Sequence, residues 1–193
     1  MTQNSKRPLP SSQQLKAELK REKYKQRYSV VMKSTFFSLL VVAAIAVLIT
    51  TLFMPVLRIH GSSMTPTLDK DQIVVSVKGS EFEPGDLVAF YMGNKILVKR
   101  VIACPGDWLE ISEDGTVYVN GDMLDEPYIS GKALGQCDLE FPYQIPESRY
   151  FMMGDHRESS VDSRSSVVGC ITEEQIVGRI FMRVWPLSLI SFL

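Results

Sequence analysis

The sequence predicts a mostly β fold, in which an antiparallel β-rich domain follows a single N-terminal transmembrane helix. Two patterns carry this prediction. Residues 34–57 are 24 residues without a charged side chain, and the chain after them consists of short apolar stretches separated by turn residues. With 193 residues, 45% of them hydrophobic and 22% charged, the chain is long enough for one full-sized domain and is neither disordered throughout nor collagen-like.

Positive charge is concentrated at the N-terminal end. Residues 1–33 carry nine Lys or Arg against two Glu, a net charge of +7, whereas the remaining 160 residues sum to −8. A basic tail also occurs in nucleic-acid-binding proteins, but the uncharged run that follows this one favours a membrane flank. Polar residues and prolines predict disorder through about residue 14, and residues 15–27 are charged enough for a short surface helix.

The uncharged run at residues 34–57 predicts a membrane anchor. As a helix it would be roughly 36 Å long, against about 30 Å of hydrocarbon in a bilayer. A cleaved secretory signal is the main alternative, but the basic segment is too long for one, and residues 50–54 contain no small-x-small cleavage site. The positive-inside tendency predicts a basic cytoplasmic tail at 1–33 and an extracytoplasmic domain at 58–193.

Seven apolar stretches in the region after the anchor predict strands, because turn residues such as Pro-Gly-Asp, Asp-Gly and Asn-Gly separate them. Thr172, with Gln175 three residues later, predicts the start of a short helix. Residues 121–149 carry few signals and are expected to form an extended loop. The predicted strands are residues 72–77, 86–91, 96–103, 108–111, 116–120, 150–153 and 179–185.

The cysteine pattern disfavours a metal site. Cys104, Cys137 and Cys170 are far apart and form no C-x-x-C motif, so zinc is not expected. One disulfide is permitted, and it would leave the third thiol unpaired. An odd number of cysteines in an exported domain argues weakly against a disulfide framework.

Lys99 is the first candidate for chemistry. In a strand over residues 96–103 its side chain shares a face with Leu97, Val101 and Ala103, because side chains alternate between the two faces. Such a lysine either extends to water at a sheet edge or is held in apolar surroundings that favour its neutral amine. Only the second arrangement makes it a base.

Two further segments contain reactive or charged side chains. Residues 61–68 (GSSMTPTL) form a Gly- and Ser-containing turn that could expose a serine hydroxyl and backbone N–H donors. Residues 153–164 (MGDHRESSVDSR) place carboxylates and guanidiniums close enough to pair and to make a turn rigid. A solvated loop is the alternative for each. His60 and His156 are the only histidines available for a Ser-His-Asp triad, and no G-x-S-x-G motif is present.

Together with residues 85–90 (GDLVAF) and 98–107 (VKRVIACPGD), these segments form four motifs that follow the anchor in order. They resemble the boxes of the type I signal peptidases, membrane-bound Ser/Lys endopeptidases that remove signal peptides from exported proteins. The chain is most similar to Gram-positive members of that family. The resemblance covers nearly everything from the anchor to Phe192.

The resemblance implies roles for individual residues. The family's nucleophile falls on Ser63, its general base on Lys99, and Ser160 matches the serine that hydrogen-bonds the lysine amine. Gly61 stands where Gram-negative members often carry an oxyanion-hole serine, so the Ser63 backbone N–H is expected to take more of that role. His156 replaces a more usual Asn and is assigned no catalytic role. The residues expected to support the site are Gly61, Asp155, Arg157, Asp162 and Arg164.

The implied reaction is acyl transfer, with no metal and no other cofactor. Neutral Lys99 accepts the Ser63 proton as Ser63 attacks a carbonyl that follows a small residue, and water then releases the acyl-enzyme. The implied partners are signal peptides of membrane-bound preproteins with small-x-small cleavage sites, and the cytoplasmic membrane, but not nucleic acid. The expected location is the cell membrane, in a single pass with the catalytic domain outside.

Two rival functions remain at this point. One is a related Ser/Lys peptidase that matures a single dedicated substrate, such as a pilin. The other is a catalytically silent, membrane-anchored binding module, which intact Ser63, Lys99 and Ser160 disfavour. The apolar C-terminal stretch that includes Phe181, Trp185 and Phe192 is either a final core strand with a tail or a face that enters the membrane interface.

Overall fold

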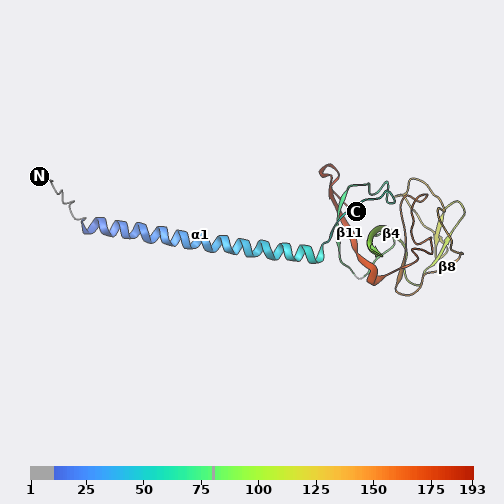
Figure 1. The fold of residues 1–193 in the computed structure, drawn as a ribbon, viewed down its shortest axis with the longest axis horizontal. Coiled ribbons are helices and arrows are strands. Elements are labelled where there is room, and N and C mark those ends of the chain that lie inside the picture. Colours follow the sequence, from blue (N-terminus) through green and yellow to red (C-terminus); the bar gives the residue numbers. More distant parts are fainter. Residues whose placement is uncertain (1–10, 80) are drawn as a thin grey trace. The chain divides into compact units, whose positions relative to one another are not determined.

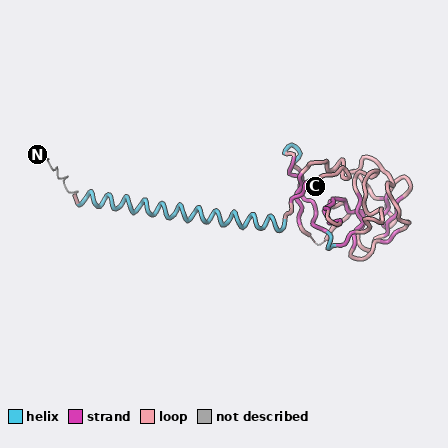
Figure 2. The backbone as a smooth tube through the Cα atoms, viewed as in Figure 1, coloured by secondary structure: helices cyan, strands magenta, loops and turns pink. Residues whose placement is uncertain are grey.

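The computed structural model describes residues 11–79 and 81–193, which divide into two units, Met1–Ile49 and Thr50–Leu193. The described part of the first unit is almost entirely helical, and the second unit consists mainly of strands and long loops (Figure 1, Figure 2). A mostly antiparallel β fold with one N-terminal apolar helix was predicted, and this prediction is confirmed.

Helix α1 (Ser12–Phe53) is one continuous helix of 42 residues. It contains no Gly or Pro, the two residues that most disfavour a helix interior, and it ends just before Pro55. The predicted disorder through residue 14 is wrong for residues 12–14, which belong to the helix. Residues 1–10, for which disorder was also predicted, lie outside the described residues. The Ser11 amide donates to Gln14 Oε1 (2.9 Å) and the Gln14 amide to Ser11 Oγ (3.4 Å), a capping box that starts the helix earlier.

The apolar part of α1 is long enough to cross a membrane, and none of its residues is buried. The uncharged run continues to Leu57, but the helix ends earlier, at Phe53. Val56 and Leu57 do not extend the helix because they pair with β2 as part of β1. The separate surface helix expected at residues 15–27 is the first part of this same helix.

The larger sheet has eight strands in the order β1-β2-β11-β3-β4-β9-β10, with β12 pairing to β11. Every pairing in it is antiparallel. The site residues on β4 therefore lie in the interior of the sheet. The strands are β1 (Val56–Arg58), β2 (Ile73–Val77), β3 (Leu87–Met92), β4 (Lys95–Ala103), β9 (Arg149–Met153), β10 (Ile171–Thr172), β11 (Ile176–Trp185) and β12 (Ser191–Phe192).

A smaller antiparallel sheet follows β4 in the chain and has the order β7-β6-β5-β8. Residues that the sequence predicted as a loop contribute β7 and β8, both too short to show an alternating pattern. The strands are β5 (Trp108–Ile111), β6 (Val117–Val119), β7 (Asp122–Met123) and β8 (Tyr143–Gln144). Two short 3-10 helices, η1 (Glu173–Gln175) and η2 (Leu187–Leu189), complete the described elements.

All seven predicted strands form, with ends that shift by up to three residues. The helix start predicted at Thr172 leads into η1, where the Thr172 amide donates to Gln175 Oε1 (3.0 Å). The sequence missed β1, because its residues continue the apolar run of the anchor.

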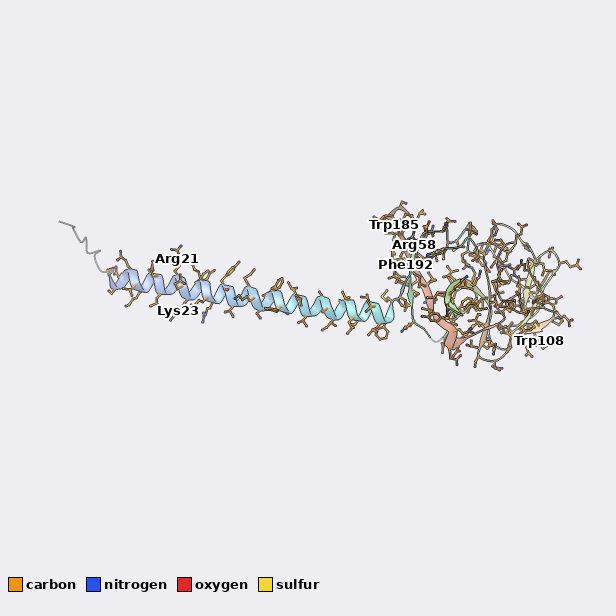
Figure 3. The ribbon with its side chains drawn as sticks, in the orientation of Figure 1. Arg21, Lys23, Arg58, Trp108, Trp185 and Phe192 are labelled. Atoms are coloured by element: carbon orange, nitrogen blue, oxygen red, sulfur yellow. The ribbon has the colours of Figure 1, made fainter. Side chains whose placement is uncertain are left out.

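The apolar C-terminal stretch is partly a strand and partly an exposed surface. Within β11, Ile180 is buried, but Trp185, Leu187 and Phe192 are 50%, 69% and 72% exposed. Trp185 and Phe192 lie at the same end of the second unit as Arg58, and Trp108 lies at the far end (Figure 3). A final strand therefore accounts for the first half of this stretch and leaves the second half without a core to pack against.

All three cysteines are free thiols. Cys170 is buried against the core of the smaller sheet, whereas Cys104 and Cys137 are half-buried. Burial raises the pKa of Cys104 to about 11, with further increases from Asp107 and other nearby carboxylates, so its thiol stays protonated at neutral pH.

Candidate active site

Ser63 lies in the loop between β1 and β2, and buried neighbours hold it in place. Met64 and Leu68 are 2% and 0% exposed and pack in one apolar cluster with Ile59. A helical-type turn, in which the Leu68 amide donates to the Met64 carbonyl (2.9 Å), spaces these two anchors. Ser63 itself is half-buried at the beginning of this turn.

Lys99 lies in the middle of β4, directly before the residues of β4 that pair with β9. It pairs with Val88 on β3, and the next residue, Arg100, pairs with Met153 on β9. Lys99 is only 2% exposed. A lysine that reaches water at a sheet edge, one of the two alternatives from the sequence, is therefore excluded.

The Lys99 amine has a defined partner. Its Nζ donates to the hydroxyl of Ser160 at 2.8 Å, and Ser160 is itself 1% exposed. Ser160 is held by its own backbone, since its amide donates to His156 O (3.1 Å) and its carbonyl accepts from Arg164 Nη2 (3.3 Å).

Gly154 brings the serine loop close to this pair. A Cβ built on Gly154 would lie inside 3.0 Å of both Ser160 Oγ and the Ser63 carbonyl oxygen. That same Ser63 oxygen accepts a hydrogen bond from the His156 amide (3.0 Å). Ser63 and Ser160, which are far apart in the sequence, thus meet at one glycine that has no room for a side chain, and Lys99 joins them through its hydrogen bond to Ser160.

Burial lowers the pKa of Lys99 to about 8, because the charged ammonium is desolvated. Asp162 opposes this change and raises the pKa, Arg164 lowers it again, and Asp155 raises it. The pKa of Asp162 would rise on burial alone, but its hydrogen bonds to Arg164 outweigh this and leave it below its ordinary value. Desolvation is therefore the dominant influence on the lysine.

Three buried ion pairs surround the site. Asp162 binds Arg164 Nε (2.8 Å) and Nη2 (2.9 Å), as the sequence led us to expect for charges within residues 153–164. Asp155 instead binds Arg100 Nε (2.9 Å) and Nη2 (2.6 Å) on β4. The third pair joins Arg157 to Glu126, which also lies outside residues 153–164.

Glu126 is a residue that the sequence did not reveal. Its carboxylate accepts from Arg157 Nη2 (2.6 Å) and Nη1 (3.0 Å), and the two side chains are 3% and 0% exposed. Tyr128 lies beside it, with the Arg100 Cζ 3.9 Å from the ring centroid. The second of two adjacent acids before a proline, in a stretch without periodicity, offered no signal of this role.

The other predicted residues differ in their surroundings. Gly61 is exposed, and a Cβ there would approach only the Ser63 amide nitrogen, at 4.0 Å. Neither histidine hydrogen-bonds the Ser63 side chain. His60 Nδ1 contacts the Arg58 carbonyl at 2.8 Å, and His156 Nδ1 contacts Ser159 Oγ.

A groove of about 650 Å³ leads to Ser63. It lies between the serine loop on one side and the β3–β4 hairpin on the other. Its lining residues are Leu57, Arg58, Ile59, His60, Gly61, Ser63, Met64, Asn94, Lys95, Ile96, Leu97 and Val98.

Residues 32–185 match the model of a protein family described as signal peptidase, peptidase S26. The chain belongs to this family. The members of the signal peptidase family are serine proteases that remove signal peptides, so the recognition made from the four sequence motifs is confirmed.

Characterised signal peptidases are similar over most of the chain. Signal peptidase IB of Staphylococcus aureus (strain COL) is 40% identical over 151 residues, which are 67% of this chain and 77% of that protein. Signal peptidase I of Bacillus amyloliquefaciens is 33% identical over 171 residues, 83% of this chain and 91% of that one. A crystal structure of a signal peptidase I from Enterococcus faecalis V583 aligns with 26% identity and a TM-score of 0.44, over 53% of this chain and 98% of that one.

The contact at Gly154 generates a prediction. Gly154→Ala forces the Ser63 backbone or the Ser160 side chain to move, and a displacement of about 1 Å near the reacting groups lowers a rate about 100-fold. We therefore expect signal-peptide removal by the purified variant to fall by about this factor. Gly131→Ala, where a Cβ meets nothing within 4 Å, is the matched control and should cleave at the wild-type rate. Wild-type cleavage by Gly154→Ala would contradict this geometry.

Proposed function

We propose that this signal peptidase uses Ser63 as nucleophile and Lys99 as general base, and cleaves preproteins at the outer face of the cytoplasmic membrane. One observation carries the proposal. The amine of a buried lysine donates to Ser160, whose hydroxyl lies against the same glycine as the backbone carbonyl of a half-buried serine, in a protein of a serine protease family.

Lys99 has the properties of a general base. With its pKa lowered to about 8, a useful fraction of the amine is neutral near physiological pH. Its hydrogen bond to Ser160 fixes the direction of Nζ. In the described residues Lys99 donates to Ser160 and not to Ser63. Hydrogen bonds between a nucleophile and its base are often long in a substrate-free enzyme and tighten when substrate binds.

The proposed reaction has two stages. Ser63 Oγ forms a bond to the scissile carbonyl carbon while its proton passes to neutral Lys99 Nζ. The resulting ammonium gives that proton to the leaving amine as the peptide C–N bond breaks. Water then attacks the acyl-enzyme, Lys99 accepts a proton from it, and the proton returns to Ser63 Oγ when the signal peptide leaves.

The backbone of the serine loop is suited to stabilise the oxyanion. No hydrogen bond from the Ser63 amide is found within the described residues, so this N–H is available to a substrate oxygen. Gly61 leaves the approach to that amide open. A backbone donor fixed in a partly buried turn contributes to the transition state without having to reorganise.

The groove supports an extended substrate with small side chains at alternate positions. The first half of β4 pairs only with β3, so its other edge is free to hydrogen-bond a peptide strand. Alternate residues of such a strand face the same way, and two of them, separated by one residue, would face the apolar wall formed by Ile96 and Val98. This arrangement favours a small-x-small pattern before the cleaved bond.

Sequence distance and charge support action at the membrane surface. Only nine residues separate Phe53, where α1 ends, from Ser63. Basic residues precede the apolar part of α1, and by the positive-inside tendency this supports a cytoplasmic N-terminus with Ser63 on the outer side. The exposed Trp185, Leu187 and Phe192 are suited to the lipid interface.

Two substitutions test the dyad. Ser63→Ala removes the nucleophile and Lys99→Ala the base, and each should lower the cleavage rate at least about 1000-fold, as loss of a residue that acts in a catalytic unit does. The rate is measured on a panel of preproteins with Ala-x-Ala sites, in detergent, with the N-terminus of each product sequenced. Circular dichroism confirms that the variants fold.

Ser62→Ala and Lys70→Ala are the matched controls, because both side chains are exposed and are not part of the proposed machinery. Both should cleave like wild type. Near-normal cleavage by Ser63→Ala or Lys99→Ala would exclude the dyad. Cleavage of only one member of the panel would favour a peptidase with a dedicated substrate.

The pH dependence of the rate gives an independent test. Because the ammonium form of Lys99 cannot accept a proton, kcat/KM should rise about tenfold per pH unit below the lysine pKa and level off above about 8. The measurement is kcat/KM from pH 6 to pH 10 with one preprotein. A rate that stays constant between pH 6 and pH 8 would show that the base is not a lysine with this pKa.

A further inference from the structure

The buried pair of Glu126 and Arg157 joins a residue of the 153–164 motif to a residue that lies outside every motif of the sequence. Both guanidinium Nη atoms of Arg157 bind the carboxylate, and its Nε donates to the Gly154 carbonyl at 3.0 Å. A bidentate ion pair of this type fixes the orientation of the guanidinium as well as its distance from the carboxylate. Glu126 therefore determines where the Arg157 guanidinium meets Gly154, the glycine around which Ser63 and Ser160 pack.

Tyr128 connects this pair to a second guanidinium. Its hydroxyl donates to Glu126 Oε1 at 2.9 Å, and its ring lies 3.9 Å from the Arg100 Cζ, a cation–π contact. Arg100 directly follows Lys99 in β4 and binds Asp155 with two hydrogen bonds. Residues 126–128 thus contact two of the three arginines whose ion pairs surround the site, one next to Lys99 in the chain and one bound to Gly154.

We propose that Glu126 and Tyr128 are positioning residues for signal-peptide cleavage. By fixing Arg157 and Arg100 they hold Gly154 and β4 at the separation that Ser63 and Lys99 require. This inference rests on the proposed function of those two residues. Neither Glu126 nor Tyr128 lines the groove, so both act through the arginines and not on the substrate.

A role in positioning accounts for this burial better than stability alone. Burying a carboxylate and a guanidinium removes both from water, and the net gain over apolar side chains of similar volume is often nil. The geometric precision that such a pair supplies matters most where small displacements change a rate. At Gly154, which lies against both Ser63 and Ser160, a small displacement would have such an effect.

The test uses the full-length protein in detergent, with kcat and KM measured per active site. The sites are counted by labelling Ser63 to completion with an acylating inhibitor. Glu126→Gln should lower kcat per labelled site about 10- to 100-fold and leave KM unchanged. Asp125→Asn, the matched control, removes the same charge from an exposed neighbour and should behave as wild type.

A pair of variants at Tyr128 keeps the inference falsifiable if Glu126→Gln does not fold. Tyr128→Leu removes the ring from Arg100 and should lower kcat about tenfold. Tyr128→Phe keeps the ring and should restore most of the rate. In both, the midpoint of the rate–pH curve should stay at the wild-type value, because Glu126 and Tyr128 are not among the groups that shift Lys99.

Wild-type kcat per labelled site in both Glu126→Gln and Tyr128→Leu, with a loss only in thermal stability or in the number of labelled sites, would overturn the inference and leave the dyad intact. Equal loss in Tyr128→Phe and Tyr128→Leu would also overturn the contribution of the ring. Labelling of the wild type at a residue other than Ser63 would overturn the proposed function, and this inference with it.

Discussion

The burial of the Lys99 amine is the constraint on which the rest of the site depends. A lysine in contact with water stays charged at neutral pH and cannot accept a proton, whereas Lys99, at 2% exposure, has a pKa of about 8. This burial requires a strand on each side of β4 and a hydrogen-bond partner inside the protein. β3, β9 and Ser160 supply these. The serine loop then needs only to be brought to the same place.

Charge pairing keeps desolvation the dominant influence on that lysine. Asp162 raises the lysine pKa and Arg164 lowers it, so the two members of this ion pair oppose each other at Nζ. Asp155 is paired with Arg100, and Arg157 with Glu126. The same pairs link three parts of the chain around Gly154, namely β4, residue 126 and residues 155–164. One set of contacts therefore controls both the electrostatics and the geometry.

Seven of the strands and the local motifs could be predicted from the sequence, because alternation and turn residues are local signals. The sequence left two environments open for Lys99, a solvent-exposed sheet edge and the apolar interior. A strand pattern shows which residues share a face with a side chain but not what covers that face. The same limit explains Asp155 and Arg157, whose partners, Arg100 and Glu126, lie 55 and 31 residues away. Glu126 belongs to a stretch with no periodicity, so only the folded chain shows its contact with the site.

The ionisation of Lys99 itself is the most direct test of this account. Its side-chain carbon and nitrogen resonances can be followed by NMR from pH 6 to pH 11 in the detergent-solubilised wild type, with Lys99→Arg to assign the signals. The account predicts a midpoint near 8, well below the midpoints of the exposed lysines. A midpoint near 10.5, the ordinary value for lysine, would show that the amine is charged at physiological pH and would contradict the central claim.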